Sequence, residues 1–338
     1  MSQTVPDVSS VDVSPYEQMV RKIAEECRII DSSTLIHSEL GKLRPPRDLE
    51  TDADYPVMRH LWRVIYLHYY AGDAAATRLF LDGGQAVAAI SDHEDYDLVE
   101  QYEAAHHCRG YWTSGWTIKA SSEAGALVSK EGVTVQAPLS RVRLGPDQTA
   151  EVRMPPARRY AVMGWYSIVG DAGPVDRQEQ NIRLYITLKY PEAGIKTLGS
   201  ITRFLRQGDV KYQYKLVNHP DAFLRRDNSV LYLPAEVWSG PLQNDLLSLL
   251  SDEKGNLRDD SPCFAKKLIP GVAFAVEPAA GSAVRSFGEH RCQLVAQGLI
   301  EAFRVGEKTS DGKVAIVRQE FEAAGLSLDR PFEGRDAA

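Results

Sequence analysis

The spacing of apolar residues divides the chain into successive regions, and the first region is helical. From Pro15 to Leu40 and again from His60 to Leu81, apolar side chains recur with the period of an amphipathic helix. The first fourteen residues are polar and acidic instead. We therefore expect residues 1–14 to be disordered and residues 15–110 to form a helical domain.

The spacing changes near Tyr111, where short runs typical of strands begin. These runs cover residues 111–120, 126–136 and 158–169, and Gly132, Gly145 and the Pro155-Pro156 pair interrupt them. The pattern predicts a small antiparallel sheet within a β-rich section at residues 111–180.

From Asn181 onward strands and helices alternate. The predicted order is strand 181–189, helix 191–207, strand 210–217, strand 229–233, helix 235–251 and strand 272–277. This is the β-α-β-β-α-β order of a split βαβ unit. A further helix begins near Ser286, which has capping-box spacing to Glu289. We expect an α+β fold with an α+β region at residues 181–310 and a C-terminal segment at residues 311–338.

Composition and charge narrow the class of protein. The 338 residues are 43% hydrophobic, which is enough for two or three domains with buried cores. The four cysteines are scattered and predict reduced thiols, and no apolar run is long enough to span a bilayer. A formal charge of −7 argues against binding to duplex nucleic acid. The expectation is a cytoplasmic protein with no nucleic-acid or membrane partner.

One stretch runs against the acidic balance of the chain. Between Arg183 and Arg226 there are nine cations and three anions, a net charge of +6. Cations gathered on an otherwise acidic protein are typical of a surface that captures a compact anion.

Two predicted strands within this stretch direct cations to one face. Alternation places on one side of each strand the polar residues Arg183, Tyr185, Thr187 and Lys189, and then Lys211, Gln213 and Lys215. Neighbouring strands would then aim Arg, Tyr and Lys side chains into a shared site. The alternative is that these are the solvated outer faces of a sheet, where charged residues are usually found.

Other candidate groups carry less specific patterns. Arg291, near a helix start, provides a phosphate seat if the helix dipole faces the ligand, although capping boxes also begin ordinary helices. His219 and His290 are candidate acids, or else loop and cap residues. The run His106-His107-Cys108 lacks a matching carboxylate cluster, so we expect no metal site. Motifs of nucleotide kinases and serine hydrolases are absent from the sequence.

Several spaced motifs resemble the HopA-type effector family. They are Gly164-Trp-Tyr-Ser-Ile-Val-Gly170-Asp171, Tyr212-Gln-Tyr-Lys215-Leu-Val-Asn-His-Pro220, Arg225-Arg226-Asp227-Asn-Ser-Val-Leu-Tyr232, Lys266-Lys267-Leu-Ile-Pro-Gly271 and Ser286-Phe-Gly-Glu-His-Arg291-Cys292. Members of this family also occur as lyase components in the biosynthesis of class V lanthipeptides and thioamitides. The resemblance covers most of residues 110–305.

The same region is distantly similar to the SpvC and OspF phosphothreonine lyases. This similarity implies that Lys215 is the base, that Arg225 binds phosphate and that Tyr232 is a site tyrosine. Arg183 takes the place of the cation on the first strand. Tyr185 occupies the position of the acid histidine of that family, which leaves the identity of the general acid open.

The residues suit the reaction that the resemblance implies. Eliminating phosphate from phosphoserine or phosphothreonine needs a base for the Cα proton and cations for the departing phosphate, and no cofactor. A Lys base must be neutral, a state that nearby Arg charges and partial burial favour, while Arg stays protonated and binds phosphate in a bidentate manner. Tyr185 is a candidate to protonate phosphate or polarise the adjacent carbonyl. We expect Arg203, Arg225 and Arg291 to share an anion pocket, with Arg226 and Lys211 as secondary candidates.

The leading hypothesis is a lyase that converts phosphorylated residues of a precursor peptide into dehydroalanine or dehydrobutyrine. A separate kinase-like phosphotransferase would supply the phosphate, and the N-terminal helical region is the candidate surface for docking it. Two alternatives stay open: a non-catalytic scaffold that binds phosphopeptides, and an effector-like lyase that acts on a host phosphoprotein.

Overall fold

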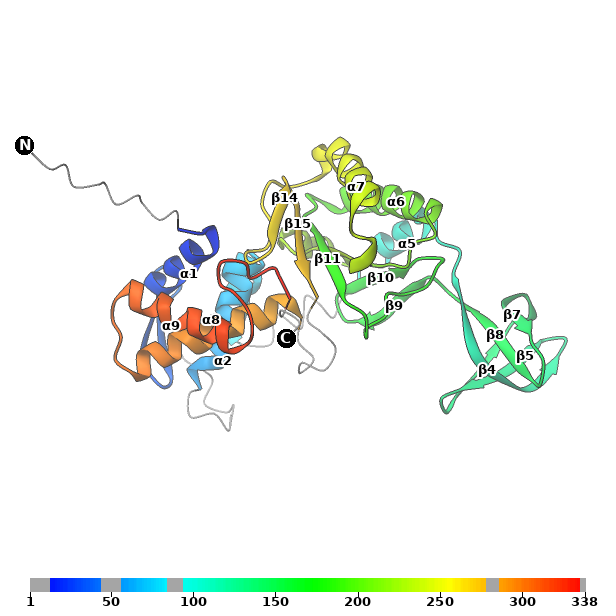
Figure 1. Ribbon diagram of the computed structural model, residues 1–338, viewed down its shortest axis with the longest axis horizontal. Coiled ribbons are helices and arrows are strands. Elements are labelled where there is room, and N and C mark those ends of the chain that lie inside the picture. The colour runs from blue at the N-terminus through cyan, green and yellow to red at the C-terminus, as the bar shows by residue number, and fades with distance from the viewer. Residues whose placement is uncertain (1–12, 44–55, 84–93, 278–285, 335–338) are drawn as a thin grey trace, which may run out of the picture. The chain divides into compact units, whose positions relative to one another are not determined.

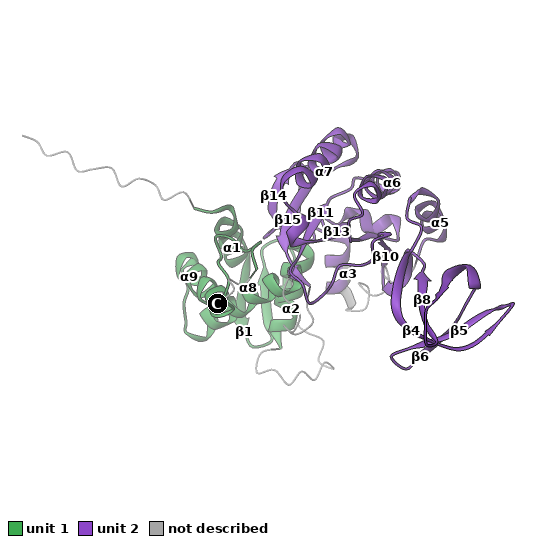
Figure 2. Ribbon diagram, turned by 45° about the vertical axis from the view of Figure 1, so that its right-hand side comes forward, with its two compact units in different colours: residues 1–70, 288–338 green, residues 71–287 purple. Residues whose placement is uncertain are grey.

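The chain forms two compact units. The computed structural model describes residues 13–43, 56–83, 94–277 and 286–334. One unit combines residues 1–70 with residues 288–338, and the other consists of residues 71–287 (Figure 2). The unit boundaries thus fall near residues 70 and 287, rather than near residues 110 and 310.

The first unit is built from both ends of the chain. Its elements are α1 (Pro15–Glu26), β1 (Cys27–Asp31), β2 (Thr34–His37), β3 (Gly41–Leu43), α2 (Val57–Val64), the π-helical turn η1 (Ile65–Tyr70), α8 (Phe287–Arg304) and α9 (Ser310–Ala323). Helix α1 begins where the Ser14 side chain accepts a hydrogen bond from the Glu17 N–H, with Pro15 at the first helical position. The helical pattern expected to continue to Leu40 ends at Glu26, and an antiparallel three-stranded sheet follows it.

Helices α1 and α9 hold the two chain ends together. They pack against each other, and each helix buries apolar residues, among them Val20 and Ile23 of α1 and Val317 and Phe321 of α9. At their edge the Arg318 guanidinium lies 2.8 Å from the Glu17 carboxylate. The segment expected as a separate C-terminal piece is therefore part of the core of this unit.

The second unit contains a five-stranded antiparallel sheet. Its strands are β4 (Tyr111–Ser122), β5 (Gly125–Lys130), β6 (Val133–Ala137), β7 (Val142–Leu144) and β8 (Thr149–Met154), in the order β6-β5-β4-β8-β7, with the 3-10 turn η2 (Leu139–Arg141) before β7. A small core around Trp116, Val128 and Val152 stabilises it. The expected strand at residues 158–169 belongs to a different sheet.

A seven-stranded antiparallel sheet forms the body of the second unit (Figure 1). Its strands are β9 (Ala157–Val162), β10 (Trp165–Val169), β11 (Asn181–Ile186), β12 (Gln213–Val217), β13 (Ser229–Pro234), β14 (Lys266–Ile269) and β15 (Val272–Val276). They lie in the order β14-β15-β11-β13-β12-β10-β9, and every neighbouring pair is antiparallel. The split βαβ unit expected from the sequence contained only β11, β12, β13 and β15, so β9, β10 and β14 are additional strands of this sheet.

Helices cover one face of this sheet. The remaining elements are α3 (Ala74–Gly83), α5 (Tyr96–Ala105), α6 (Pro191–Gln207), α7 (Gly240–Asp252) and the 3-10 turns η3 (Pro220–Leu224), η4 (Ala235–Val237) and η5 (Lys254–Asn256). Apolar residues of α5, α6 and α7 form one core with alternate strand residues, including Leu184, Leu216 and Leu231. Since side chains alternate along a strand, the residues directly before and after Leu184, Leu216 and Leu231 in their own strands point to the opposite face.

The mixed α+β class expected from the sequence is confirmed. Helix α6 spans Pro191–Gln207 as the sequence predicts, starting at a proline that needs no N–H partner and followed by Gly208. In the parts of the chain that the structure describes, no helix combines the length and apolarity that a membrane crossing requires.

Candidate active site on the seven-stranded sheet

The second face of the sheet brings together residues from four neighbouring strands. In the strand register, Arg183 of β11 lies opposite Tyr232 of β13, and Lys215 of β12 lies opposite Val230 of β13 and Ser167 of β10. Directly paired residues share a face, so Arg183, Tyr232, Lys215 and Ser167 all lie on the side away from α6 and α7.

Lys215 is held between aromatic rings. Its ammonium nitrogen lies 4.4 Å from the ring centroid of Trp165 and 5.5 Å from that of Tyr232. The side chain is half-buried, and no carboxylate of the described residues lies within ion-pair distance of it. A lysine placed over π faces without an acidic partner is available to a substrate.

Arg183 is the most enclosed cation of this face. It is 3% exposed and forms an ion pair with Glu277, which directly follows β15. Its guanidinium also donates to the Tyr185 hydroxyl at 2.9 Å and lies 5.2 Å from the ring centroid of Tyr232. The ring centroid of Phe287, the last residue of the second unit, lies 5.9 Å from the same guanidinium.

Tyr232 connects the two cations. Both Lys215 and Arg183 lie over its ring, and Tyr185 reaches the same guanidinium through its hydroxyl. The structure therefore assembles four of the predicted site residues, Lys215, Tyr185, Tyr232 and Arg183, on one face of the sheet.

Arg225 and Arg226 are close in sequence to this face but are bound to acidic side chains. The Arg225 guanidinium donates twice to the Asp227 carboxylate, with both distances 2.9 Å. Arg226 donates to Asp260 at 3.0 Å. Burial alone would raise the pKa of Asp260, but hydrogen bonds and charges from Arg226 and Arg258 outweigh it and lower that pKa. Both guanidinium groups are thus already bound to carboxylates, and these ion pairs stabilise the loop before β13.

Two predicted cations lie away from the assembled face. Arg203 is exposed on α6, the helix that covers the opposite side of the sheet, and its guanidinium contacts His107 at 3.2 Å. Lys211 is exposed before the start of β12, since that strand begins at Gln213 rather than Val210. The structure does not bring these two to Lys215.

Arg291 belongs to the first unit and is a buried structural residue there. It is 2% exposed, and its guanidinium donates to the carbonyl oxygens of Pro331 and Glu333 at 2.8 and 2.9 Å. His290 contacts the same guanidinium. Buried between helix α8 and the C-terminal residues, Arg291 connects parts of its own unit. Arg203, Arg225 and Arg291, which were expected to share one anion pocket, thus have different partners. Arg203 contacts His107, Arg225 pairs with Asp227, and Arg291 donates to main-chain carbonyls of its own unit.

The remaining histidine and cysteine candidates have local structural partners. The His219 ring accepts from the Asp221 N–H at 3.3 Å at the start of η3. The Cys108 thiol contacts the Tyr212 hydroxyl at 3.0 Å, and burial raises the pKa of Cys108 to about 11. No cluster of three or more metal-ligating side chains occurs within the described parts of the chain.

Three further residues complete the site, and sequence analysis assigned no role to them. Trp165 lies inside the Gly164–Gly170 motif, and its membership of that motif is the one feature of the sequence that could have pointed to it. Glu277 is separated from Arg183 by 94 positions, and Phe287 begins α8. Nothing local in the sequence links these two positions to β11.

Chemically, the face offers a lysine without an acidic partner among the described residues, a deeply placed guanidinium and two phenols. A planar guanidinium binds an oxyanion through paired N–H donors. A lysine in an aromatic environment can exchange a proton with a bound group. The two hydroxyl-bearing rings provide further donors beside the same cations.

One comparison with known proteins, that with protein families, agrees with the resemblance seen in the motifs. A model described as the HopA1 effector protein family matches residues 157–332, which include every strand of the seven-stranded sheet. An effector protein from Pseudomonas syringae pv. tomato strain DC3000 is structurally similar, with a TM-score of 0.49, 10% identity, and coverage of 94% of this chain and 97% of that chain. An effector protein from Pseudomonas syringae pv. syringae strain 61 has a TM-score of 0.41 and 13% identity, and the coverage is 81% of this chain and 96% of that chain. No curated protein matches the sequence.

Proposed function

The chain belongs to the HopA1 effector protein family, and we propose that it is a phosphoserine and phosphothreonine lyase. The observation that carries the proposal is the pairing of Lys215, which has no acidic partner among the described residues, with the guanidinium of Arg183 across the Tyr232 ring. Elimination of phosphate needs these two functions, a base and an oxyanion seat, on one surface.

In this mechanism neutral Lys215 removes the Cα proton of the phosphorylated residue. The electrons of the broken C–H bond form the Cα–Cβ double bond, and the Cβ–O bond breaks toward the phosphate. Inorganic phosphate leaves with that oxygen, and the proton stays on the Lys215 nitrogen until solvent removes it. The Trp165 and Tyr232 rings, whose centroids lie 4.4 and 5.5 Å from the Lys215 nitrogen, stabilise the ammonium that accepting this proton creates.

The phosphate of the substrate binds Arg183 in place of Glu277. Both groups are oxyanions that accept from the same fork of N–H donors. Glu277 keeps the guanidinium oriented in the free protein, and its side chain is 29% exposed, so water can receive the displaced carboxylate. Binding is then an exchange of one anion for another beside a cation that is already in position.

Tyr185 and Tyr232 supply the protons that the phosphate and the adjacent carbonyl require. The Tyr185 hydroxyl already contacts the guanidinium that would hold the phosphate. A phenol at this point can donate to a phosphate oxygen as the Cβ–O bond lengthens. Tyr232, next to Lys215, is placed to polarise the carbonyl beside Cα.

The experiment compares variants on a synthetic phosphothreonine peptide and follows both released phosphate and peptide mass. Lys215→Ala is expected to abolish elimination with a modest change in peptide affinity, because the base acts in the transition state. Arg183→Gln should weaken both binding and turnover. Lys196→Ala, on the opposite side of α6 from the core, is the matched control and should behave as wild type. Turnover retained in Lys215→Ala would remove the central assignment.

The substrate we propose is a phosphorylated precursor peptide in lanthipeptide or thioamitide biosynthesis, with a kinase-like enzyme as the source of phosphate. Repeated dehydration of one peptide is efficient when lyase and kinase are held together, because tethering raises the effective concentration toward the millimolar range. Co-expression and size-exclusion chromatography test this association. Separate elution of the two proteins, while one peptide still undergoes several dehydrations, would show that stable association is unnecessary.

Mapping the docking surface requires substitutions rather than a deletion. The N-terminal helices proposed as that surface share a unit with α8 and α9. Removing residues 1–105 would take away α1 and leave α9, which buries Val317 and Phe321, without the helix that it packs against. Charge reversals on the exposed side of α1, such as Lys22→Glu and Glu25→Lys, keep the unit intact and test the same surface.

The family itself favours one alternative substrate, a host phosphoprotein, because its description names effectors. The same site and mechanism would then act on a folded partner. A scaffold without catalysis is the third candidate, and it would bind phosphopeptide but release no phosphate. Testing a precursor-like peptide, a phosphoprotein and an unphosphorylated control side by side separates these functions.

A further inference from the structure

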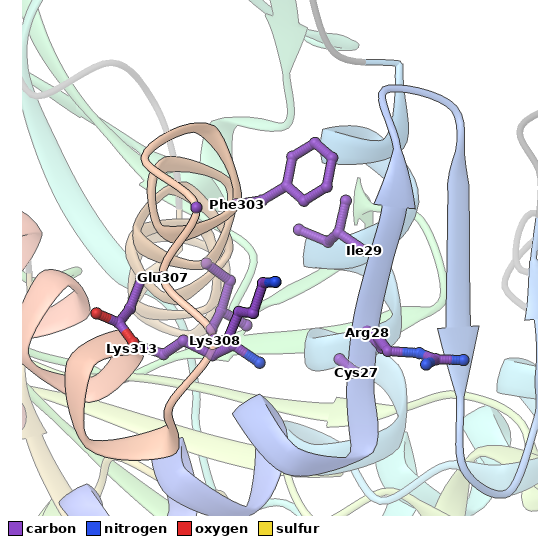
Figure 3. Close-up of a pocket in the computed structure, with 9 residues that line it drawn as sticks. Cys27, Arg28, Ile29, Phe303, Glu307, Lys308 and Lys313 are labelled. Carbon is purple, nitrogen blue, oxygen red and sulfur yellow. The ribbon is translucent and has the colours of Figure 1, made fainter.

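The first unit contains a pocket that the proposed reaction does not use. It has a volume of about 440 Å³, which is within the usual range for ligand sites. Strand β1 forms one wall through Cys27, Arg28 and Ile29, and the end of α8 forms the other through Leu299 and Phe303 (Figure 3). The Phe303 and Ile29 side chains extend toward each other across it.

Strand β1 presents to this pocket an edge that no described strand pairs with. Among the described residues β1 pairs with β2 alone, and Figure 3 shows β2 on the side of β1 away from α8. The Ser38 N–H bonds to the Glu26 carbonyl, so by the alternation of antiparallel pairs Arg28 also bonds toward β2. Ile29 then directs its N–H and carbonyl toward the pocket, where an added strand would find them.

The rim of the pocket is cationic although the chain as a whole is acidic. It carries Arg28, Lys308 and Lys313 against the single carboxylate of Glu307. Glu307 is already engaged by the N–H and hydroxyl of Thr309, both at 2.7 Å. No ion pair of Lys308 or Arg28 is found among the described residues.

We propose that this pocket binds an extended, acidic peptide segment of a partner polypeptide, which adds to the edge of β1. Main-chain bonds to Ile29 give the segment its direction, as in other strand-addition complexes. An apolar side chain enters between Ile29 and Phe303, and the carboxylates that alternate with it meet Lys308. Three features of the described residues support one occupant: a strand edge that no other strand pairs with, an apolar cleft beside it, and cations without acidic partners at its rim.

Fluorescence anisotropy with labelled probes tests this site on the full-length protein. The probe is a short peptide in which Val and Glu alternate, with a Val/Lys peptide of equal length as the charge control. A third peptide has the Val/Glu sequence with alternate backbone nitrogens methylated, which removes the N–H groups that would pair with β1. We expect binding of the Val/Glu peptide, at least about tenfold weaker binding of the methylated form, and none of the Val/Lys form.

One substitution and its control locate the contact. Lys308→Glu is expected to weaken the Val/Glu peptide about three- to tenfold at low salt, with a smaller effect in high salt. Lys42→Glu changes the same charge on the exposed strand β3, at the far side of this sheet, and should leave affinity unchanged. Equal losses in both variants would reveal a general charge effect and would overturn the site.

The outcomes are independent of the lyase proposal, because no phosphorylated residue is involved. Equal affinity for the methylated and unmethylated Val/Glu peptides would refute strand addition, whatever the effect of Lys308→Glu. Absence of binding by the Val/Glu peptide would refute the proposal outright, even if the lyase assays succeed.

Discussion

Replacing Glu277 by Gln separates the structural and the chemical roles of Arg183. The guanidinium is nearly fully buried and relies on this carboxylate, on the Tyr185 hydroxyl and on aromatic rings. In wild type, Glu277 neutralises the charge and also competes with any incoming phosphate. The substitution keeps an acceptor oxygen in nearly the same place but removes the negative charge.

The cost follows from what the guanidinium loses. Removing one partner of a buried ion pair typically costs about 3–5 kcal/mol. The Glu277 side chain is 29% exposed, and the amide oxygen of Gln still accepts one hydrogen bond. The substitution therefore replaces a charge-assisted hydrogen bond with a neutral one. We expect Glu277→Gln to lower the free energy of unfolding by about 1–2 kcal/mol, and Glu277→Ala to lower it by about 3 kcal/mol.

Urea unfolding followed by tryptophan fluorescence measures this loss, because four of the five tryptophans lie in the second unit. The informative arm adds inorganic phosphate. In Glu277→Gln the guanidinium has lost its competing anion, so phosphate should stabilise this variant more than wild type. The gain is about 2.7 kcal/mol at a phosphate concentration one hundred times the dissociation constant.

Two controls decide whether the reasoning holds. Glu179→Gln removes a carboxylate from an exposed position before β11 and should change neither stability nor the phosphate response. The double variant Arg183→Met with Glu277→Gln should show no phosphate response. If phosphate stabilises the double variant as much as Glu277→Gln alone, Arg183 is not the phosphate seat.

Three further predictions concern packing and ionisation. Gly170→Ala places a Cβ 2.5 Å from the Tyr212 ring and should destabilise by about 1–3 kcal/mol in urea unfolding, whereas Gly255→Ala, with open space around its Cβ, should be nearly neutral. The Cys108 thiol, with its pKa raised to about 11, should resist iodoacetamide at pH 7 until the protein unfolds, since roughly one thiol in ten thousand is ionised; rapid labelling would contradict this. Because the pKa of Asp260 is lowered in the folded state, Asp260→Asn should be less stable than wild type at pH 7. That difference should persist above the unfolded pKa of about 4 and disappear as the pH falls through the folded pKa, and a constant difference in acid-unfolding curves would refute it.

Local patterns in the sequence predict some elements well. Helix α6 has its apolar period, a starting proline and a following glycine in one short window, and its bounds match the expectation. Strands β1 to β3 lie where the sequence predicts a helical domain, because short apolar runs fit either a helix or a strand. The packing of α1 on α9 has no local signal at all, since it joins residues from opposite ends of the chain.

The site was predictable in the part that alternation determines. A period of two places Arg183 and Tyr185 on one face of β11 and Lys215 on the equivalent face of β12. The sequence does not say which strands are neighbours, so Ser167 and Trp165 of β10 could not be placed beside Lys215. The sequence also does not show that Arg183 pairs with Glu277, which lies 94 positions away.

Arg225 illustrates the same limit at short range. Its partner Asp227 is two residues away and visible in the sequence, yet spacing alone does not distinguish a bound guanidinium from an available one. In the structure the two side chains face each other before β13, and two hydrogen bonds join them. By contrast, Arg183 and Glu277 are paired because β11 and β15 are neighbours in the sheet.

The most direct test of the central claim uses a phosphothreonine peptide that carries deuterium at Cα of the phosphorylated residue. Elimination with Lys215 as the base predicts that each released phosphate accompanies a dehydrated peptide that has lost its deuterium, and that Lys215→Ala forms neither product. Phosphate release with an intact threonine that keeps its deuterium would instead identify hydrolysis. Tight binding of the peptide without any release would leave the protein as a phosphopeptide-binding scaffold, and either result would contradict a lyase.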